Sequence, residues 1–258
     1  MDFALGEPDM QINHYTDIHA HLLYGVDDGP QTLEDSMRML ELSKAEGIRT
    51  IIATPHYGIE NGYAPDAQTI RTRFKEVQAQ AAVAYPEMRL FLGSELYCAP
   101  DKVLQRLDEG KALPMAGTRY ILLEFLEWGD RQETAEHITS TMLDIAKTDW
   151  LPILAHAQRY KDFKGKQDLY RTLVAGGVYL QINAYDLADR ADDWTRQNTR
   201  WLVQHKLVHF IGTDSHLPDH RPPAMRSGVA YLYDHYEESY VDALVHGNAE
   251  KLLAGERV

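Results

Sequence analysis

The sequence has almost no cysteine. Cys98 is the one cysteine, so an intramolecular disulfide cannot form, which is typical of proteins in a reducing compartment. Long apolar runs are also missing, because stretches such as 120–123 and 151–155 are far too short to cross a bilayer. The first residues, MDFALGEPDMQIN, lack a basic segment followed by an apolar one, so no signal peptide is expected. Together these absences predict a cytoplasmic protein.

Positive charge is scarce as well. Lysine and arginine total 26, against 39 aspartates and glutamates, which gives a net charge of -13. Such a chain repels phosphate backbones and anionic lipid, so neither nucleic acid nor a membrane is an expected partner. In other respects the 258 residues, 44% hydrophobic and 25% charged, have the composition of a soluble folded protein.

Several catalytic motifs are absent from the sequence. It contains no GxGxxG or P-loop for a nucleotide, no GxSxG for a serine esterase and no HExxH for a zinc peptidase. A cysteine-dependent tyrosine phosphatase needs C-x5-R, but Leu104 stands where that arginine would be. Cys98 is therefore expected to be a small buried hydrophobic side chain.

Short apolar runs alternate with helical patterns along the chain. Seven runs rich in aliphatic and aromatic residues are interpreted as strands: 14–20, 49–54, 89–94, 119–125, 151–155, 178–184 and 207–213. Both faces of each run are apolar, as in strands buried in a parallel sheet. Seven such strands separated by helices predict a closed or nearly closed α/β barrel, with a doubly wound open sheet as the alternative.

The helical stretches carry their own signals. Thr32 followed by Asp35 is similar to a capping box, and Gly47 marks the end of the helix that begins there. A stripe of apolar side chains at helical spacing is expected to pack on the sheet: Ala135, Ile138, Met142 and Ile145. A last helical segment covers about 239–253.

Histidines and carboxylates stand where the predicted strands end. His19 and His21 lie two residues apart on the first strand, so they point to the same side and can bind one metal ion. The other strand ends and the first loop carry further ligand types: Asp28, His56, Glu95, Glu124, His156, Asp214 and His216. Because the carboxyl ends of barrel strands meet at one rim, these residues are predicted to converge. A carboxylate inside an apolar run, such as Glu124, is costly without a cation.

The donor types narrow the chemistry. Imidazoles mixed with carboxylates and no thiolate favour Mn, Fe or Zn. So many ligands indicate more than one ion, which predicts metal-activated water attacking a charged ester. Arg159 and Arg221 follow ligand-bearing strand ends and suit phosphate oxygens. The remaining histidines are interpreted as structural or surface residues: His14, His137, His205, His209, His220, His235 and His246.

Several sequence blocks, taken together, resemble a known family. They are TDIHAHLLYGVDDGP, ATPH, GSELY, LLEF, ILAHAQRY and FIGTDSHLPDHRPP. They are similar to the PHP (polymerase and histidinol phosphatase) phosphoesterases, and within them to the bacterial capsule-locus tyrosine phosphatases of the CpsB/YwqE type. The resemblance implies a distorted seven-stranded TIM-like barrel, the PHP fold. It starts near residue 16, so we expect a single domain over 14–258 and an N-terminal extension over 1–13.

The resemblance also implies three divalent ions per chain, with manganese as the first candidate and iron or zinc as alternatives. The first ion would be held by His19, His21, Glu95 and Asp214. Glu95 would bridge to a second ion, completed by Glu124 and His156. The third ion would be held by Asp28, His56 and His216.

The chain departs from the family pattern at three places. Ala157-Gln158 stands where the family has Pro-Glu, and Tyr24 replaces a proline in the first loop. After the sixth strand, 184–186 read Ala-Tyr-Asp instead of a small polar run. These changes concern the substrate mouth and the residues behind the ligands, and leave the ligand types intact.

By resemblance, the protein is a protein-tyrosine phosphatase that uses metal-activated hydroxide and forms no covalent phosphoenzyme. The implied partner is a bacterial tyrosine kinase with a tyrosine-rich tail, in exopolysaccharide and capsule regulation. Two alternatives stay open: a phosphatase of a small phosphoester such as histidinol phosphate, and a metal-bound regulatory module without activity. A related amidohydrolase would need a lysine at a strand end, and none is found there. The oligomeric state is also left open.

Overall fold

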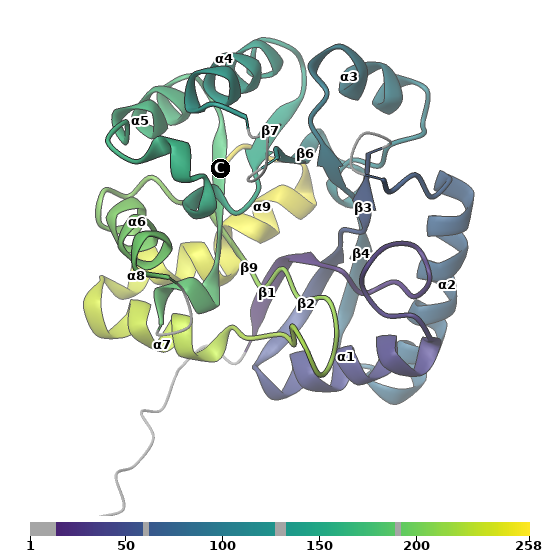
Figure 1. Cartoon of the computed structure of the whole chain (residues 1–258). Helices are drawn as coiled ribbons and strands as arrows, with labels where there is room; N and C mark the ends of the chain where they lie inside the picture. The colour runs from purple at the N-terminus through teal and green to yellow at the C-terminus, as the bar shows by residue number, and fades with distance from the viewer. Residues whose placement is uncertain (1–13, 59–61, 127–132, 189–191) are drawn as a thin grey trace, which may run out of the picture.

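The computed structural model describes residues 14–58, 62–126, 133–188 and 192–258; the predicted extension over 1–13 lies outside them. Strands occupy the centre of the molecule and helices surround them (Figure 1). The described residues form the strands β1 Tyr15–Ala20, β2 Ile48–Ala53, β3 His56–Tyr57, β4 Arg89–Leu92, β5 Glu95–Tyr97, β6 Tyr120–Glu124, β7 Leu151–Leu154, β8 Tyr179–Asn183 and β9 Phe210–Gly212. These strands pair in parallel, as their apolar faces predict.

The strands form a curved wall that closes on itself. One part of the wall has the order β1-β2-β4, and the other has the order β3-β5-β6-β7-β8-β9. The two parts are continuous along the chain, because β2 leads into β3 and β4 leads into β5, and the Gly93 N–H extends the β2–β4 ladder by donating to the Ala53 carbonyl at 2.8 Å. At the opposite edge, the Asp214 N–H donates to the His19 carbonyl at 2.7 Å and connects β1 to the segment after β9. Because the order rises without reversal, the fold is the predicted distorted barrel and the doubly wound sheet is excluded.

Two short strands lie just beyond the ends of predicted runs. The run over 49–54 corresponds to β2, and β3 follows after Pro55, which has no N–H to donate to the ladder. The run over 89–94 corresponds to β4, and β5 follows after Gly93 and Ser94. A Cβ on Gly93 would lie 2.9 Å from the Met115 sulfur, so this close approach requires glycine. The sequence analysis did not predict β3 and β5, which pair His56 with Glu95.

Helices and short turns connect the strands. In the described part of the chain these are α1 Leu33–Ala45, α2 Ala67–Ala84, α3 Pro100–Asp108, α4 Ala135–Ala146, α5 Asp168–Ala175, α6 Asp193–Gln204, α7 Arg226–His235, α8 Glu238–Asp242 and α9 Asn248–Ala254, with short turns η2 Met115–Gly117, η3 Ala157–Arg159, η4 Lys161–Phe163, η5 Ala184–Leu187 and η6 Ala243–Gly247. The predicted last helix corresponds to α8, a π-helical turn and α9. Among the described helices, no segment has the length and apolar character required to span a bilayer.

The predicted boundaries of α1 are confirmed. Thr32 is its N-cap, and the Thr32 hydroxyl oxygen accepts a hydrogen bond from the Asp35 N–H at 3.1 Å. Gly47 follows the last turn with φ +87°, a left-handed conformation that favours glycine. A Cβ at this position would also lie 2.9 Å from the Tyr15 ring, so the absence of a side chain lets β1 approach the end of α1.

Two clusters of buried apolar side chains fill the molecule. The outer cluster lies between the wall and the helices and includes the predicted stripe of α4. The inner cluster includes Tyr120 and Leu122 of β6 together with Leu252 of α9, which lies behind the strands in Figure 1. Glu124 follows Leu122 on the same face of β6, because side chains alternate along a strand. The face of β6 that points into the barrel is therefore apolar along most of its length and ends in the carboxylate of Glu124.

His209 makes the stability of the fold dependent on pH. Its Nδ1 accepts a hydrogen bond from the Leu180 N–H at 3.2 Å, so this nitrogen carries no proton in the folded state. Burial lowers the pKa of His209 to about 4. An unfolded histidine titrates near pH ~6.5. Between these values the unfolded chain binds a proton that the folded chain does not. The contribution of His209 to the free energy of unfolding should therefore fall as the pH drops from about 6.5 to 4, by on the order of 3 kcal/mol.

The test compares the wild-type protein with His209→Asn, because the Asn side-chain oxygen can accept the same hydrogen bond without titrating. Both metal-free proteins are unfolded in urea between pH 4.5 and 7.5, so that loss of metal at low pH does not contribute. We expect a shallower pH dependence in the variant. Equal slopes for the two proteins would show that His209 does not contribute to the effect.

Candidate metal centre

β1 places His19 and His21 in the interior of the barrel mouth, where both are fully buried. The strand is held there by Asp17, which the sequence analysis did not single out. The Asp17 carboxylate accepts hydrogen bonds from the Thr213 N–H at 2.9 Å, the Thr213 hydroxyl at 2.5 Å and the His19 N–H at 3.1 Å. Burial raises the pKa of Asp17 to about 6. These bonds join β1, which carries His19, to the segment after β9, which carries Asp214 and His216.

Glu95, the first residue of β5, lies among four imidazoles. Its Oε2 is 3.1 Å from His19 Nε2 and 3.2 Å from both His21 Nε2 and His56 Nδ1. Its Oε1 is 2.9 Å from His156 Nε2. Burial alone would raise the pKa of Glu95, but His19 and His56 overcome this and hold it well below its usual range. The centre of the site is therefore a charged, buried carboxylate.

Asp214 connects the imidazoles to two arginines. Its Oδ1 lies 3.6 Å from His19 Nε2 and 3.6 Å from His21 Nε2. Its Oδ2 accepts hydrogen bonds from Arg159 Nη1 at 3.0 Å and from Arg221 Nη2. Burial would raise the pKa of Asp214, but Arg221, His19 and Arg159 hold it well below its usual range. The two arginines that the sequence places near the rim thus meet at one carboxylate oxygen.

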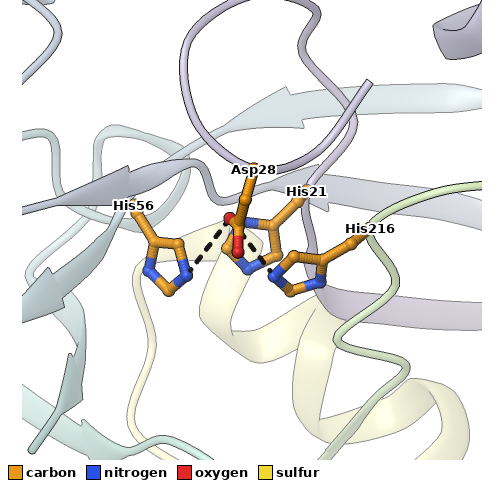
Figure 2. Close-up of side chains that lie close together, drawn as sticks. All are labelled: His21, Asp28, His56 and His216. Atoms are coloured by element: carbon orange, nitrogen blue, oxygen red, sulfur yellow. Dashed lines mark ion pairs between the residues drawn. The ribbon is translucent and has the colours of Figure 1, made fainter. Parts of the chain in front are cut away.

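A second group of side chains lies on the outer edge of the site. Asp28 Oδ1 is 3.6 Å from His56 Nε2 and 3.5 Å from His216 Nε2, and Figure 2 shows His21 beneath them. The rings of His21 and His216 are stacked, with centroids 3.8 Å apart. The Asp28 side chain is 47% exposed, whereas His21 is buried. The site is therefore closed at Glu95 and open to solvent at Asp28.

The described residues contain three groups whose donor atoms lie within 4.8 Å of one another. The groups are His19, His21, Glu95 and Asp214; His21, Asp28, His56 and His216; and His56, Glu95 and Glu124. The first has the same members as the first ligand set implied by resemblance. The others differ from the implied sets, because His21 joins the group of Asp28 and His56 takes the place of His156 beside Glu124. Among the described residues, none of the seven histidines interpreted as structural belongs to a group.

The buried donor atoms of this site fit divalent ions. Four of them make no hydrogen bond of good geometry: Nε2 of His19 and of His21, Nδ1 of His56, and Oε2 of Glu95. Buried polar atoms normally have partners, and unpaired ones are costly. An imidazole lone pair and a carboxylate oxygen aimed at the same point repel each other unless a cation lies between them. The donor set, with nitrogen and oxygen atoms and no sulfur, suits Mn, Fe or Zn.

Two further residues support the ligands from behind. Asp27 Oδ2 is 2.8 Å from His21 Nδ1 and accepts the His56 N–H at 3.0 Å. Gln181 Oε1 is 3.1 Å from His19 Nδ1 and accepts the His156 N–H at 2.7 Å. Such contacts fix the orientation of a ligating ring. The sequence signal for Gln181 is a polar residue inside the buried strand β8; Asp27 is adjacent to Asp28 and gives no signal that separates the two.

Comparison with known proteins agrees with this geometry. The model of a family described as "Capsular polysaccharide synthesis, CpsB/CapC" matches residues 15–254. The tyrosine-protein phosphatase CpsB of Streptococcus agalactiae serotype III is 27% identical, and the alignment covers 92% of this chain and 97% of that protein. The tyrosine-protein phosphatase YwqE of Bacillus subtilis is 27% identical, with 94% of this chain and 92% of that protein covered.

A solved structure shows the same relationship in three dimensions. It comes from work on YwqE from Bacillus subtilis and CpsB from Streptococcus pneumoniae, described as unique metal-dependent tyrosine phosphatases. It superposes with a TM-score of 0.83 at 26% identity and covers 94% of this chain and 96% of that chain. The family match extends over nearly the whole barrel, including each strand that carries a predicted ligand. The chain therefore belongs to the CpsB/CapC family of capsular polysaccharide synthesis proteins.

Proposed function

We propose that this protein is a metal-dependent protein-tyrosine phosphatase. The observation that carries the proposal is the convergence of five histidines and four carboxylates, from distant strands, beside two arginines. Two relatives of this protein are named tyrosine-protein phosphatases. We further propose that residues 14–258 act as one domain.

We propose that three divalent ions bind, manganese first among the candidates. His19, His21, Glu95 and Asp214 would hold one ion. His21, Asp28, His56 and His216 would hold another, and Glu95, Glu124 and His56 would hold the third, with His156 held against Glu95. One carboxylate shared between ions is consistent with the position of Glu95 among four imidazoles.

The residues around these ions suggest how a phosphate ester would react. Bound divalent ions would supply an activated water as nucleophile and offset charge on the phosphoryl oxygens. Arg159 and Arg221, both partly exposed beside Asp214, are placed to hold phosphoryl oxygens from the open side. A phenol leaves readily because its pKa is near ~10, so the site needs no strong general acid. Cys98 takes no part, because it is buried and burial raises the pKa of its thiol.

The physiological substrate that we propose is the phosphorylated tail of a bacterial tyrosine kinase that acts in capsule or exopolysaccharide synthesis. We propose that the two proteins interact in the cytoplasm. This assignment is supported by the capsule-related names of the family and of its members. The site supports it through its open edge at Asp28 and the arginines, which can admit a chain end.

The decisive experiment compares substrates under one condition. The purified, manganese-loaded protein is given a phosphotyrosine peptide, a phosphoserine peptide, histidinol phosphate and a sugar phosphate at equal concentrations. We expect kcat/KM for the phosphotyrosine peptide to exceed the others by about 100-fold or more, because phenolate is the better leaving group and the site is open. A higher value for histidinol phosphate would assign the protein to small-molecule hydrolysis, and no turnover of any substrate would favour a regulatory module.

A further inference from the structure

We propose that Tyr185 and Asp186 are positioning residues that hold the Arg159 guanidinium in the orientation needed to grip a phosphoryl group. The inference rests on the proposed function and extends it to residues outside the ligand set. It comes from the contacts of η5, the turn after β8, with η3, the turn after β7. Both turns lie at the carboxyl ends of their strands, on the arginine side of the site.

Three edges of the Arg159 guanidinium face a partner. Its Nη1 donates to Asp214 Oδ2 at 3.0 Å, and its Nη2 donates to the Tyr185 hydroxyl. Its Nε lies 3.8 Å from Asp186 Oδ2. The Tyr185 hydroxyl also lies 3.4 Å from Asn183 Nδ2, which donates to Asp214 at 3.1 Å. A planar guanidinium with partners on all sides has one orientation, so little conformational entropy is lost when it binds an anion.

Asp186 is itself held from behind. Gln158 Nε2 donates to Asp186 Oδ2 at 2.7 Å, and Asn198 Nδ2 of α6 donates to the Gln158 carbonyl at 3.0 Å. The Asp186 side chain is only 4% exposed, and a carboxylate so buried needs a cation nearby. Burial raises the pKa of Asp186, and the positive charge of Arg159 opposes that rise. Gln158 and Asp186 are two of the positions at which the sequence departs from its family pattern, and here the two side chains contact each other.

Arg221 provides an internal comparison. It approaches the same Asp214 oxygen as Arg159, and its Nη1 lies 3.5 Å from His216 Nε2. It comes from the segment after β9, and among the described residues it makes no hydrogen bond or ion pair with Tyr185 or Asp186. Changes at Tyr185 or Asp186 should therefore act through Arg159 and leave the contribution of Arg221 unchanged.

The test is a pair of double-mutant cycles on the manganese-loaded protein. Tyr185→Phe removes only the hydroxyl, and Asp186→Asn removes the charge while leaving an oxygen for Gln158. Each is made alone, with Arg159→Lys and with Arg221→Lys. Tyr233→Phe is the matched control, because its hydroxyl also donates to a carboxylate, Asp242 at 2.7 Å, but contacts none of the site residues named above. For every variant, binding of inorganic phosphate is measured by calorimetry. The values of kcat and KM are measured with a phosphotyrosine peptide and with an alkyl phosphate, and the melting temperature is recorded.

We expect Tyr185→Phe and Asp186→Asn each to weaken phosphate binding and to lower kcat/KM by about 10-fold on both substrates. In the Arg159→Lys background the further loss should be less than about twofold, while the full loss should persist with Arg221→Lys. A full loss in the Arg159→Lys background would overturn the inference. A loss confined to the phosphotyrosine peptide would also overturn it, since Tyr185 would then contact the substrate ring. Phosphate binding without hydrolysis by the wild-type protein would count against the proposed function alone, because the calorimetric cycles would still test the positioning.

Discussion

Removal of divalent ions is expected to lower the hydrolysis of phosphotyrosine peptides by this protein by about 1,000-fold or more, and manganese should restore it. The reason is that Nε2 of His19, Nε2 of His21 and Oε2 of Glu95 are buried and make no hydrogen bond, so a cation is the partner that these atoms lack. The same ions are expected to bind the folded state and not the unfolded chain. The melting temperature should therefore fall on chelation and rise with manganese concentration.

The measurement uses protein treated with a chelator, dialysed and then titrated with manganese, iron(II), zinc or magnesium. Activity, melting temperature and metal content per chain are followed together. Activity and thermal stabilisation should rise over the same range of metal concentration. Full activity in protein shown to hold less than about 0.05 metal ions per chain would refute the proposed mechanism.

Glu95→Gln is expected to be the most damaging single substitution in the site, with a loss of kcat/KM of about 1,000-fold or more. The change keeps the shape of the side chain but removes the negative charge that faces four imidazoles at 2.9 to 3.2 Å. It also introduces an amide N–H₂ group, which donates hydrogen bonds where a ligand oxygen is required. We expect the variant to lose at least one ion per chain, because the side chain lies in two of the three donor groups.

A matched control separates this effect from a general loss of carboxylate charge. Glu250→Gln makes the same chemical change at a surface ion pair, where Glu250 Oε1 is 2.8 Å from Arg89 Nη1. Surface ion pairs contribute little, so kcat/KM and metal content should match those of the wild-type protein. Metal content is measured by mass spectrometry after dialysis. A Glu95→Gln protein that keeps its full metal content and turnover would remove Glu95 from the centre.

The barrel was predictable because its signals are local. Alternating apolar runs and helical stripes depend on residues within one element, and most of the described strands lie where such runs occur. The short strands β3 and β5, which follow β2 and β4, were not predictable in the same way. Their ladder pairs His56 with Glu95, a contact between segments far apart in sequence.

The same distinction applies to the site. Strand ends that carry histidine and carboxylate predict a shared rim, because parallel strands in a barrel all point the same way. The sequence did not predict which donor atoms face one another. This depends on the twist of the wall and on side-chain rotation. As a result, His21 belongs to two of the donor groups and His56 lies beside Glu124. Gln181 is marked only as a polar residue inside a buried strand, and Asp27 has no signal that separates it from Asp28, because supporting residues are recognised by what they touch.

The sequence by itself determined the class of fold, the position of most strands and the chemical types of the donors. It did so because apolar residues recur at a short, fixed spacing along each buried strand or helix, and this spacing is visible in the sequence. Only the tertiary structure decided how these donors are grouped, that Arg159 and Arg221 meet at Asp214, and that Asp186 faces Arg159. These relations join residues up to about 200 positions apart, and their distances follow from how the whole barrel packs rather than from any local pattern.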